Sequence, residues 1–220
     1  MIKVLELFAG SRSIGKAAEA QGLEVFSVDV KQWGNIDLVK DINQLELKDV
    51  PFVPDIVWSG TPCTTYSIAA ISHHRNPDFS PKTDFAIFCD EMNIRVNKLI
   101  EDWLKLNPAL LWYIENPRGA LRKMPFMKPF DRATVWYCQY GDNRAKPTDI
   151  FTNNLFSLFN PEGWQPRPEC WNGRKNCHDP APRGSRTGTQ GLKDNHERSK
   201  MPEQLCKEII DYSIKKISNG

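Results

Sequence analysis

The sequence predicts an α/β fold, an open, mostly parallel sheet with helices on both faces, and three observations lead to this fold class. Short apolar runs alternate with helical patterns through the first half of the chain, which is the rhythm of consecutive strand, helix and strand units. Polar and glycine-containing motifs follow directly after the apolar runs. The chain has 220 residues, of which 40% are hydrophobic and 25% charged, enough to bury one core. We therefore expect one main domain with a small appendage.

The N-terminal region predicts the first complete unit. Residues 2–8 read as an apolar strand, residues 14–22 as a helix that Gly22 closes, and residues 23–30 as a second strand. Met1–Phe8 contains no basic leader and no cleavage site, so we expect no signal peptide. No apolar run approaches the length of a membrane span, and we expect a soluble, cytoplasmic protein without a membrane partner.

The unit repeats along the middle of the chain. Residues 55–60 predict a buried strand, residues 92–106 an amphipathic helix, and residues 109–116 a further strand behind Pro108. Between the first two elements, the hydrophilic and proline-interrupted segment 64–84 predicts a loop that serves as a lid over the strand ends.

The last part of the chain changes character twice. Residues 132–140 and 149–156 predict two β segments that form a hairpin through residues 141–147. Residues 157–200 are rich in proline and show little periodicity, which indicates an irregular insertion. A final helix is expected over residues 202–217.

Cysteine usage and charge narrow the class of protein. The six cysteines are scattered through the chain, so we expect free thiols in a reducing compartment rather than a disulfide framework. The net charge of +2 is too small to indicate a nucleic-acid partner by itself. The basic surplus is concentrated between Arg167 and Lys200, among small polar residues.

Polar motifs stand at the ends of the predicted strands. Phe8–Ser13 follows the first strand, Asp29 ends the second, and Asp41 follows a third segment. Pro62-Cys63 follows residues 55–60, and Glu115-Asn116-Pro117 ends residues 109–116. Because ligands of open α/β sheets bind beyond the carboxyl ends of the strands, we expect these motifs to share one crevice.

The first two motifs suggest a class of cofactor. Gly10 lies in a strand-to-helix turn, which is often only structural. Asp29 adds weight, because a carboxylate at that strand end can accept hydrogen bonds from both hydroxyls of a ribose. A single glycine cradles a pyrophosphate poorly, so the pattern favours an adenosyl cofactor without phosphates over a dinucleotide.

Cys63 and Glu115 each have a structural and a chemical interpretation. Cys63 could be a small buried hydrophobic residue, but it precedes a polar loop, which suits an exposed nucleophile whose pKa is lowered by cations or helix N-termini. Glu115 could be a strand-end carboxylate bound to backbone N–H groups, or an unpaired acid in an apolar setting.

Together these residues resemble the cytosine-C5 DNA methyltransferase family, whose five motifs occur here in the family's order between residue 1 and about residue 155. The resemblance implies a Rossmann-like methyltransferase fold and the cofactor S-adenosylmethionine. It implies that the cofactor is bound by Phe8, Ala9, Gly10, Ser11, Asp29, Val30, Asp41, Ile42 and Pro62.

The resemblance also implies the reaction. Cys63 would add to carbon 6 of cytosine so that carbon 5 can accept a methyl group, Glu115 would assist at N3 and the exocyclic amine, and Asn116 would orient the strand end. The target base would be flipped out of duplex DNA. The family's supporting arginine has no clear counterpart, and Arg144 and Lys146 are the candidates. RNA, a free cytosine nucleotide, or a catalytically idle nucleic-acid-binding role are the alternatives.

The resemblance divides the chain into three parts: an S-adenosylmethionine-binding catalytic domain at 1–156, a much reduced target-recognition insertion at 157–200, and a closing helix at 201–220 that packs back on the catalytic domain. Within the insertion, residues 183–191 are small, polar and basic, as a loop along DNA phosphates would be.

Histidines and cysteines outside these motifs raise the question of a metal. Cys170, Cys177 and His178 could bind zinc, with Cys138 or His196 brought near by folding, but the spacing matches no recognised finger. We therefore assign no metal ligand. The adjacent His73 and His74 are expected to be solvated loop residues.

Overall fold

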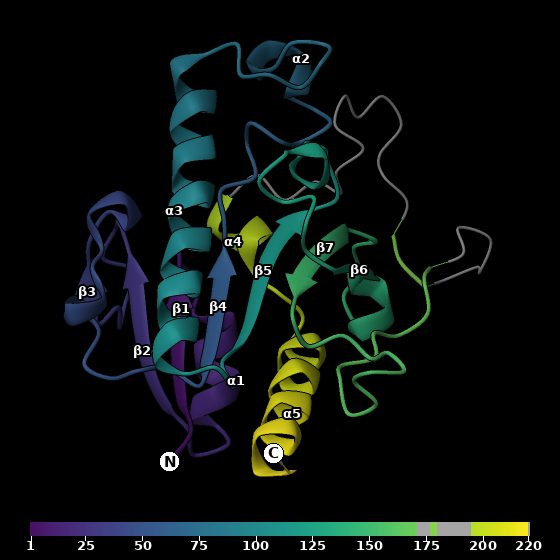
Figure 1. Ribbon diagram of the computed structural model, residues 1–220. Coiled ribbons are helices and arrows are strands. Elements are labelled where there is room, and N and C mark those ends of the chain that lie inside the picture. The colour runs from purple at the N-terminus through teal and green to yellow at the C-terminus, as the bar shows by residue number, and fades with distance from the viewer. Residues whose placement is uncertain (171–176, 180–194, 220) are drawn as a thin grey trace.

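The predicted fold class is confirmed by a computed structural model, which describes residues 1–170, 177–179 and 195–219. A seven-stranded sheet in the order β3-β2-β1-β4-β5-β7-β6 forms the centre of the molecule (Figure 1). Its strands are β1 (Lys3–Leu7), β2 (Glu24–Asp29), β3 (Leu38–Val39), β4 (Ile56–Gly60), β5 (Leu111–Pro117), β6 (Arg132–Trp136) and β7 (Pro147–Thr152). The first five strands pair in parallel, and only β7 is antiparallel to its neighbours β5 and β6.

Helices cover both faces of this sheet. On one face lies the long α3, and on the other α1 packs beside α5 (Figure 1). The described helices are α1 (Ser13–Glu19), α2 (Ile71–His74), α3 (Asp84–Leu106), α4 (Asn195–Ser199) and α5 (Glu203–Asn219), with 3-10 turns η1 (Ile42–Gln44), η2 (Leu47–Asp49), η3 (Ala120–Lys123) and η4 (Tyr137–Tyr140).

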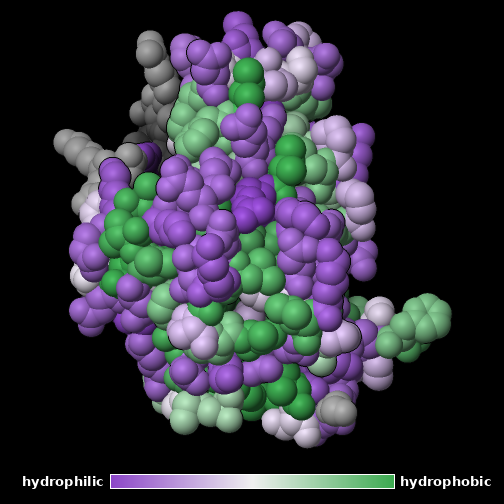
Figure 2. All heavy atoms as spheres, turned by 60° about the vertical axis from the view of Figure 1, so that its left-hand side comes forward, coloured by the Kyte–Doolittle hydropathy of each residue, from purple (hydrophilic) through white to green (hydrophobic). Residues whose placement is uncertain are grey.

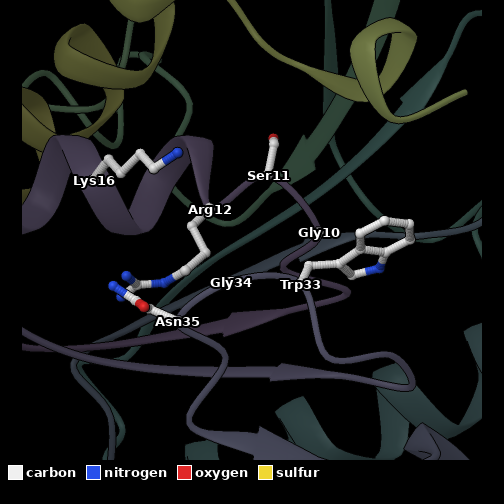
Figure 3. Close-up of a pocket in the computed structure, with 7 residues that line it drawn as sticks. All are labelled: Gly10, Ser11, Arg12, Lys16, Trp33, Gly34 and Asn35. Carbon is white, nitrogen blue, oxygen red and sulfur yellow. The ribbon is translucent and has the colours of Figure 1, made fainter. Parts of the chain in front are cut away.

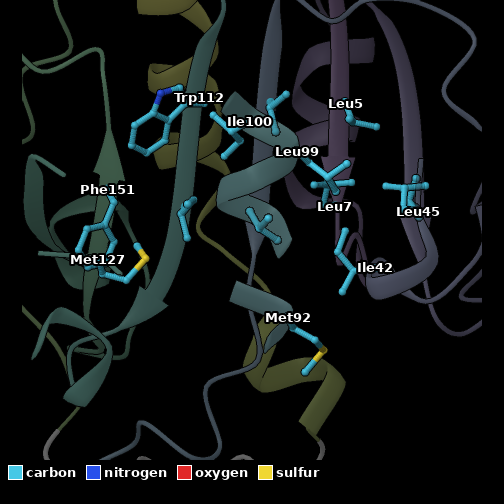
Figure 4. Packing of buried hydrophobic residues seen from close by; sticks show 14 of the residues in the cluster. Leu5, Leu7, Ile42, Leu45, Met92, Leu99, Ile100, Trp112, Met127 and Phe151 are labelled. Carbon is cyan, nitrogen blue, oxygen red and sulfur yellow. The ribbon is translucent and has the colours of Figure 1, made fainter. Parts of the chain in front are cut away.

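Two apolar cores result, one on each face, because successive strand residues point to opposite sides. The α3 side buries alternate residues of β1 and β5 against the helix (Figure 4). Its labelled members include Leu5, Leu7, Leu99, Ile100, Trp112 and Phe151. The α1 and α5 side buries the intervening residues, such as Val4, Ile56 and Tyr113. Each fully buried aliphatic side chain stabilises the fold by about 1.5–3 kcal/mol relative to leaving it in water.

Among the element boundaries that differ from the sequence prediction, two have a clear physical reason. Helix α3 begins at Asp84, because the Thr83 hydroxyl accepts a hydrogen bond from the Ala86 N–H (3.2 Å) and caps the helix before its apolar periodicity starts. The expected β segment 132–140 is a strand only to Trp136 and then tightens into η4, which ends at Gly141 with φ 85°. The predicted hairpin is present, with β6 and β7 antiparallel.

The described part of the insertion is anchored to the second core. Trp164 is fully buried, and its Nε1–H donates to Oε1 of Glu208 in α5 (3.1 Å). Residues 183–191, which we expect to follow DNA phosphates, lie outside the described residues. No described helix is both long and apolar enough to cross a bilayer. On the β3 and α3 side, hydrophilic and hydrophobic residues are interspersed (Figure 2).

Candidate active site

Three strand ends meet around Gly60, as expected from a parallel sheet. Gly60 pairs with Glu115 of β5, and the preceding Ser59 pairs with Leu7 of β1. A Cβ atom placed on Gly60 would lie 3.8 Å from the Phe8 carbonyl oxygen and 3.9 Å from Oε2 of Glu115. The loop after β1 and the Glu115 carboxyl therefore face one another across a residue that has no side chain.

Asn116 fastens the loop that bears Cys63. Its Nδ2 donates to the carbonyl oxygens of Thr61 (3.0 Å) and Pro62 (3.4 Å). The Cys63 carbonyl oxygen then accepts from the backbone N–H groups of Tyr66 (3.1 Å) and Ser67 (2.9 Å), which turns the chain. The structure thus joins Cys63 to the strand end of Glu115 through the Asn116 amide.

Glu115 is almost completely buried and has unusual neighbours. The Tyr137 hydroxyl donates to its Oε1 (3.4 Å), and the Lys146 ammonium donates to the same hydroxyl oxygen (3.5 Å). Burial raises the pKa of Glu115, while the charge of Lys146 opposes that rise. Burial also disfavours the charged form of Lys146, so it lowers the pKa of that amine. A protonated Glu115 can donate a hydrogen bond, which an ionised carboxylate cannot.

Cys63 is half-buried, and its electrostatics differ from the sequence expectation. Burial and the nearby Glu115 raise the pKa of the thiol, whereas Lys146 and Arg198 act to lower it. The thiol is therefore protonated at neutral pH in this state. Protonation of Glu115 removes the negative charge that opposes formation of the Cys63 thiolate.

Of the two basic candidates, Lys146 is the one beside Glu115. Lys146 also donates to the Arg198 carbonyl oxygen (3.1 Å) and lies 4.5 Å from the Tyr137 ring centroid. Arg144 instead pairs with Asp142 (2.5 Å) and donates to the carbonyl oxygens of Arg198 and Lys200. Its contacts hold the segment that leads into α5.

A buried network that sequence reasoning missed supports the Cys63 loop from behind. Arg75 donates to the Thr65 carbonyl oxygen (3.0 Å) and forms two hydrogen bonds to Asp90 of α3 (2.7 and 3.1 Å). The Tyr66 hydroxyl donates to the same Asp90 carboxylate (2.6 Å). The segment expected to be a loop contains α2 and is fixed to α3 at Arg75. His73 and His74, expected to be solvated loop residues, lie in α2: His73 is exposed, whereas His74 is half-buried with its Nδ1 3.1 Å from the Thr83 hydroxyl.

A cavity of about 300 Å³ opens beside the loop after β1. It is lined by Gly10, Ser11, Arg12, Lys16, Trp33, Gly34 and Asn35. Trp33 lies on one side of the opening, with Arg12 and Asn35 on the other (Figure 3). The sequence identified Gly10 and Ser11 as cofactor residues here, and Arg12 lies in the same motif. Trp33, Gly34 and Asn35 were missed because the loop after β2 has no recognisable motif, and Lys16 was missed because it lies within α1.

Asp29 holds this loop in place. Its two carboxylate oxygens accept from the backbone N–H groups of Gly10 (3.0 Å) and Lys31 (2.9 Å). Phe8 and Arg12 have positive φ angles of 52° and 54°, so the loop turns through a backbone conformation that residues other than glycine rarely adopt. The carboxylate of Asp29 thus couples the two loops that border the cavity.

The remaining expected cofactor residues lie at the same edge of the sheet with differing exposure. Ala9 is buried and donates to the Val28 carbonyl oxygen (3.1 Å), and Pro62 is half-buried. Asp41 caps η1 by accepting from the Asn43 N–H (2.9 Å), and Ile42 is buried in the α3-side core. The Val30 side chain is 61% exposed.

The fold is similar to that of solved methyltransferase structures, and the predicted Rossmann-like methyltransferase fold is confirmed. A prophage-encoded E. coli protein assigned as a DNA modification methyltransferase matches with a TM-score of 0.52 at 14% identity, over 77% of this chain and 52% of that chain. The Entamoeba histolytica methyltransferase EhMeth matches with a TM-score of 0.50 at 12% identity, over 77% of this chain and 58% of that chain. Just over half the length of either structure is thus spanned. The sequence matches no protein-family model and no curated protein.

Proposed function

We propose that this protein is a DNA (cytosine-5-)-methyltransferase, which transfers a methyl group from S-adenosylmethionine to carbon 5 of cytosine through a covalent cysteine adduct. The observation that supports this best is the Asn116 amide, which fastens the Cys63 loop to the strand end of Glu115. A nucleophile and an acid of raised pKa at neighbouring strand ends are the pair that this reaction requires.

The residues around the cavity fit the cofactor. Trp33 offers an aromatic face for an adenine ring, and Asp29 can accept from ribose hydroxyls beside the loop that it already holds. Lys16 supplies positive charge for a carboxylate. The Arg12 guanidinium is paired with Glu19 through Nη2, but its Nε is buried with no hydrogen-bond partner among the described residues and could donate to the ligand. When bound, S-adenosylmethionine supplies a methyl group on a positively charged sulfur.

The side chains can activate a cytosine in two coupled ways. The Cys63 thiol gives its proton to a solvent water and the sulfur adds to carbon 6, while the electron density that moves toward N3 is stabilised by hydrogen bonding or proton donation from Glu115. Carbon 5 then becomes nucleophilic. After methylation, loss of the carbon 5 proton expels the Cys63 sulfur and restores the aromatic ring.

The substrate we propose is duplex DNA with the target base flipped out. Carbon 6 is hidden in a stacked duplex, so the base must leave the stack at a cost of a few kcal/mol. Lys146 and Arg198 bring positive charge close to Cys63, in keeping with a polyanionic substrate. We further propose that residues 157–200 contact the DNA. Arg144 would position the end of this segment, where the chain leads into α5.

One set of reactions tests this function. The protein is incubated with methyl-labelled S-adenosylmethionine and, separately, with duplex DNA, RNA or dCMP. Label should enter DNA, and Cys63→Ser should reduce transfer by about three orders of magnitude or more. Transfer to RNA or dCMP alone would show that DNA is not the substrate. Transfer to none of the three would contradict the proposed methyltransferase activity.

A trapping experiment tests the covalent step. DNA with 5-fluorocytosine at the target position cannot lose a proton from carbon 5, so it should form a stable adduct with the wild-type protein. The same duplex with ordinary cytosine is the control and should accumulate none. Methylation without any trapped adduct would show that Cys63 is not the nucleophile.

A further inference from the structure

Four metal-binding side chains come together outside the candidate active site. The ligand atoms of Cys138, Cys170, Cys177 and His178 all lie within 4.8 Å of one another. The Sγ atoms of Cys170 and Cys177 are 3.2 Å apart, and Nδ1 of His178 lies 2.9 Å from the Cys177 sulfur and 3.6 Å from the Cys170 sulfur.

These side chains come from two distant parts of the chain. Cys138 belongs to η4, beside the catalytic sheet, whereas the other three belong to the insertion. Cys170 is only 7% exposed, and the other three are half-buried. Folding therefore supplies the fourth ligand that the spacing in the sequence did not identify, while the side chain of His196 lies outside the described residues.

We propose that Cys138, Cys170, Cys177 and His178 bind one zinc ion. Zinc bonds of about 2.3 Å to sulfur and about 2.0–2.1 Å to nitrogen, in tetrahedral geometry, place neighbouring ligand atoms about 3.5–3.8 Å apart. The separations between the ligand atoms begin at 2.9 Å and extend to no more than 4.8 Å, on both sides of that range, so side-chain rotations that move the ligand atoms by about 1 Å or less bring them to it. Because protein atoms fill all four positions, the site is structural and leaves no place for a substrate.

A disulfide explains the cluster less well than a metal does. A bond between Cys170 and Cys177 would involve two of the four groups and leave the Cys138 thiol and the His178 imidazole without a shared role. All six cysteines are free in the structure, and sulfur and imidazole together are the donor set that zinc prefers.

The ion would connect the insertion to the turn that serves the active site. Cys138 directly follows Tyr137, whose hydroxyl binds Glu115. The same turn is held from the insertion by Arg167, which donates from its backbone N–H to the Tyr140 hydroxyl (2.9 Å) and from Nη1 to the Gln139 carbonyl oxygen (2.8 Å). A zinc ion would hold the insertion to η4 more strongly than these hydrogen bonds do. The zinc proposal does not depend on the reaction proposed above.

Metal analysis of the full chain, purified under reducing conditions without chelators, tests the proposal. We expect one zinc per chain, and Cys170→Ser or Cys138→Ser should reduce it to less than a tenth. Cys63→Ser is the matched control, because it removes a thiol outside the cluster, and it should retain one zinc. Less than half a zinc per wild-type chain, even after incubation with zinc chloride, would overturn the proposal.

Cobalt substitution gives an independent readout that does not rely on destabilised variants. Co²⁺ added to the metal-free wild-type chain should give tetrahedral d–d bands and sulfur-to-cobalt charge-transfer absorption. His178→Cys should keep one metal and strengthen the charge-transfer band, since a fourth thiolate replaces the imidazole. An octahedral spectrum, or a Cys170–Cys177 disulfide found by mass spectrometry in the freshly purified protein, would contradict the site.

Removal of zinc should also lower the thermal stability. Chelation is expected to reduce Tm by about 5 °C or more in the wild-type chain, because a ligand that binds only the folded state stabilises it. Added zinc should restore the original Tm. In Cys170→Ser the chelator should change Tm by less than about 1 °C, and an equal shift in both proteins would contradict a specific site.

Discussion

Glu115 and Lys146 favour each other's charged form within a space that is largely closed to water. Burial raises the pKa of the acid and lowers that of the amine, and each charge partly reverses the other's shift. The Lys146 charge also favours the Cys63 thiolate. One amine therefore influences both groups that the proposed reaction uses.

Replacing Lys146 should shift the pH dependence of methyl transfer. In Lys146→Met the pKa values of Cys63 and Glu115 both rise further, so the bell-shaped profile of kcat/KM should move to higher pH and its maximum should fall about tenfold or more. Lys146→Arg retains the charge and should keep the profile near that of the wild type. An unshifted profile in Lys146→Met would show that the amine does not act on this pair.

Glu6 lies in β1, just before the first loop of the candidate site, and makes the stability of the protein depend on pH. Its buried carboxyl accepts from the N–H groups of Ile14 (3.1 Å) and Gly15 (3.0 Å), yet burial raises its pKa from 4.5 to about 7. The folded state thus binds the proton more tightly than the unfolded state. The contribution of the protonated Glu6 carboxyl to the stability of the folded state is complete below pH 4.5 and is lost as the pH rises through 7.

Glu6→Gln should remove this pH dependence. Between pH 4.5 and pH 7.5 the free energy of unfolding of the wild type should fall relative to the variant by roughly 3 kcal/mol. The amide can accept only one of the two backbone N–H groups, so a constant offset is also expected. Urea denaturation across this pH range measures both, and parallel curves for the two proteins would contradict a raised pKa of Glu6.

At the scale of elements, the site depends on how α3 and the Cys63 loop are joined. Arg75 and Tyr66 both meet Asp90, and Gly119 approaches so closely that an added Cβ would lie 2.3 Å from the Tyr66 carbonyl oxygen. The loop is therefore fixed on one side by α3 and on the other by the chain after β5. A rigid support of this kind is what a positioned nucleophile needs.

Arg75→Met should destabilise the protein by about 3–5 kcal/mol, because it leaves the Asp90 carboxylate without its buried partner. Lys105→Met is the control, since it breaks the exposed pair with Asp102 on the same helix and should cost at most about 0.5 kcal/mol. Urea denaturation measures both changes. A loss below about 1 kcal/mol in Arg75→Met would show that the network does not hold the loop.

The elements that the sequence predicted well are those with local signals. The strands that end near Cys63 and Glu115, and the approximate position of α5, follow from apolar periodicity and adjacent turn residues. Arg75 and Tyr137 were missed because their partners belong to other elements, 10 to 22 residues away, and only packing brings them together. The start of α3 was missed because its cap at Thr83 precedes the apolar pattern.

At the scale of the whole molecule, α5 and the insertion complete the second core. Trp164 reaches α5 through Glu208, whose carboxylate also accepts from Arg167 (2.9 Å) and from the Tyr140 hydroxyl (3.2 Å). One acid of α5 thus gathers groups from two other parts of the chain, η4 and the insertion. The stability of the sheet and the placement of the insertion are therefore linked.

Trp164→Ala should lower the free energy of unfolding by about 3–5 kcal/mol, since it leaves a cavity in the second core and removes one of the two hydrogen bonds that Oε1 of Glu208 accepts. Phe159→Ala is the matched control, because that ring is 99% exposed and its loss should change stability by about 0.5 kcal/mol at most. Chemical denaturation compares the two. Equal effects would show that Trp164 does not anchor the insertion.

The insertion leaves the catalytic frame and returns to it at neighbouring points, which makes the frame an adaptable scaffold. Arg167 binds η4 where the insertion departs, and Lys146 and Arg144 bind the carbonyl oxygens of Arg198 and Lys200 where it returns. With both ends fixed, doubling the length of the intervening chain costs only about 0.6 kcal/mol in loop-closure entropy. In the DNA-contacting role proposed above, exchange of this segment would therefore be a physically inexpensive way to change the target preference while the proposed reaction centre stays the same.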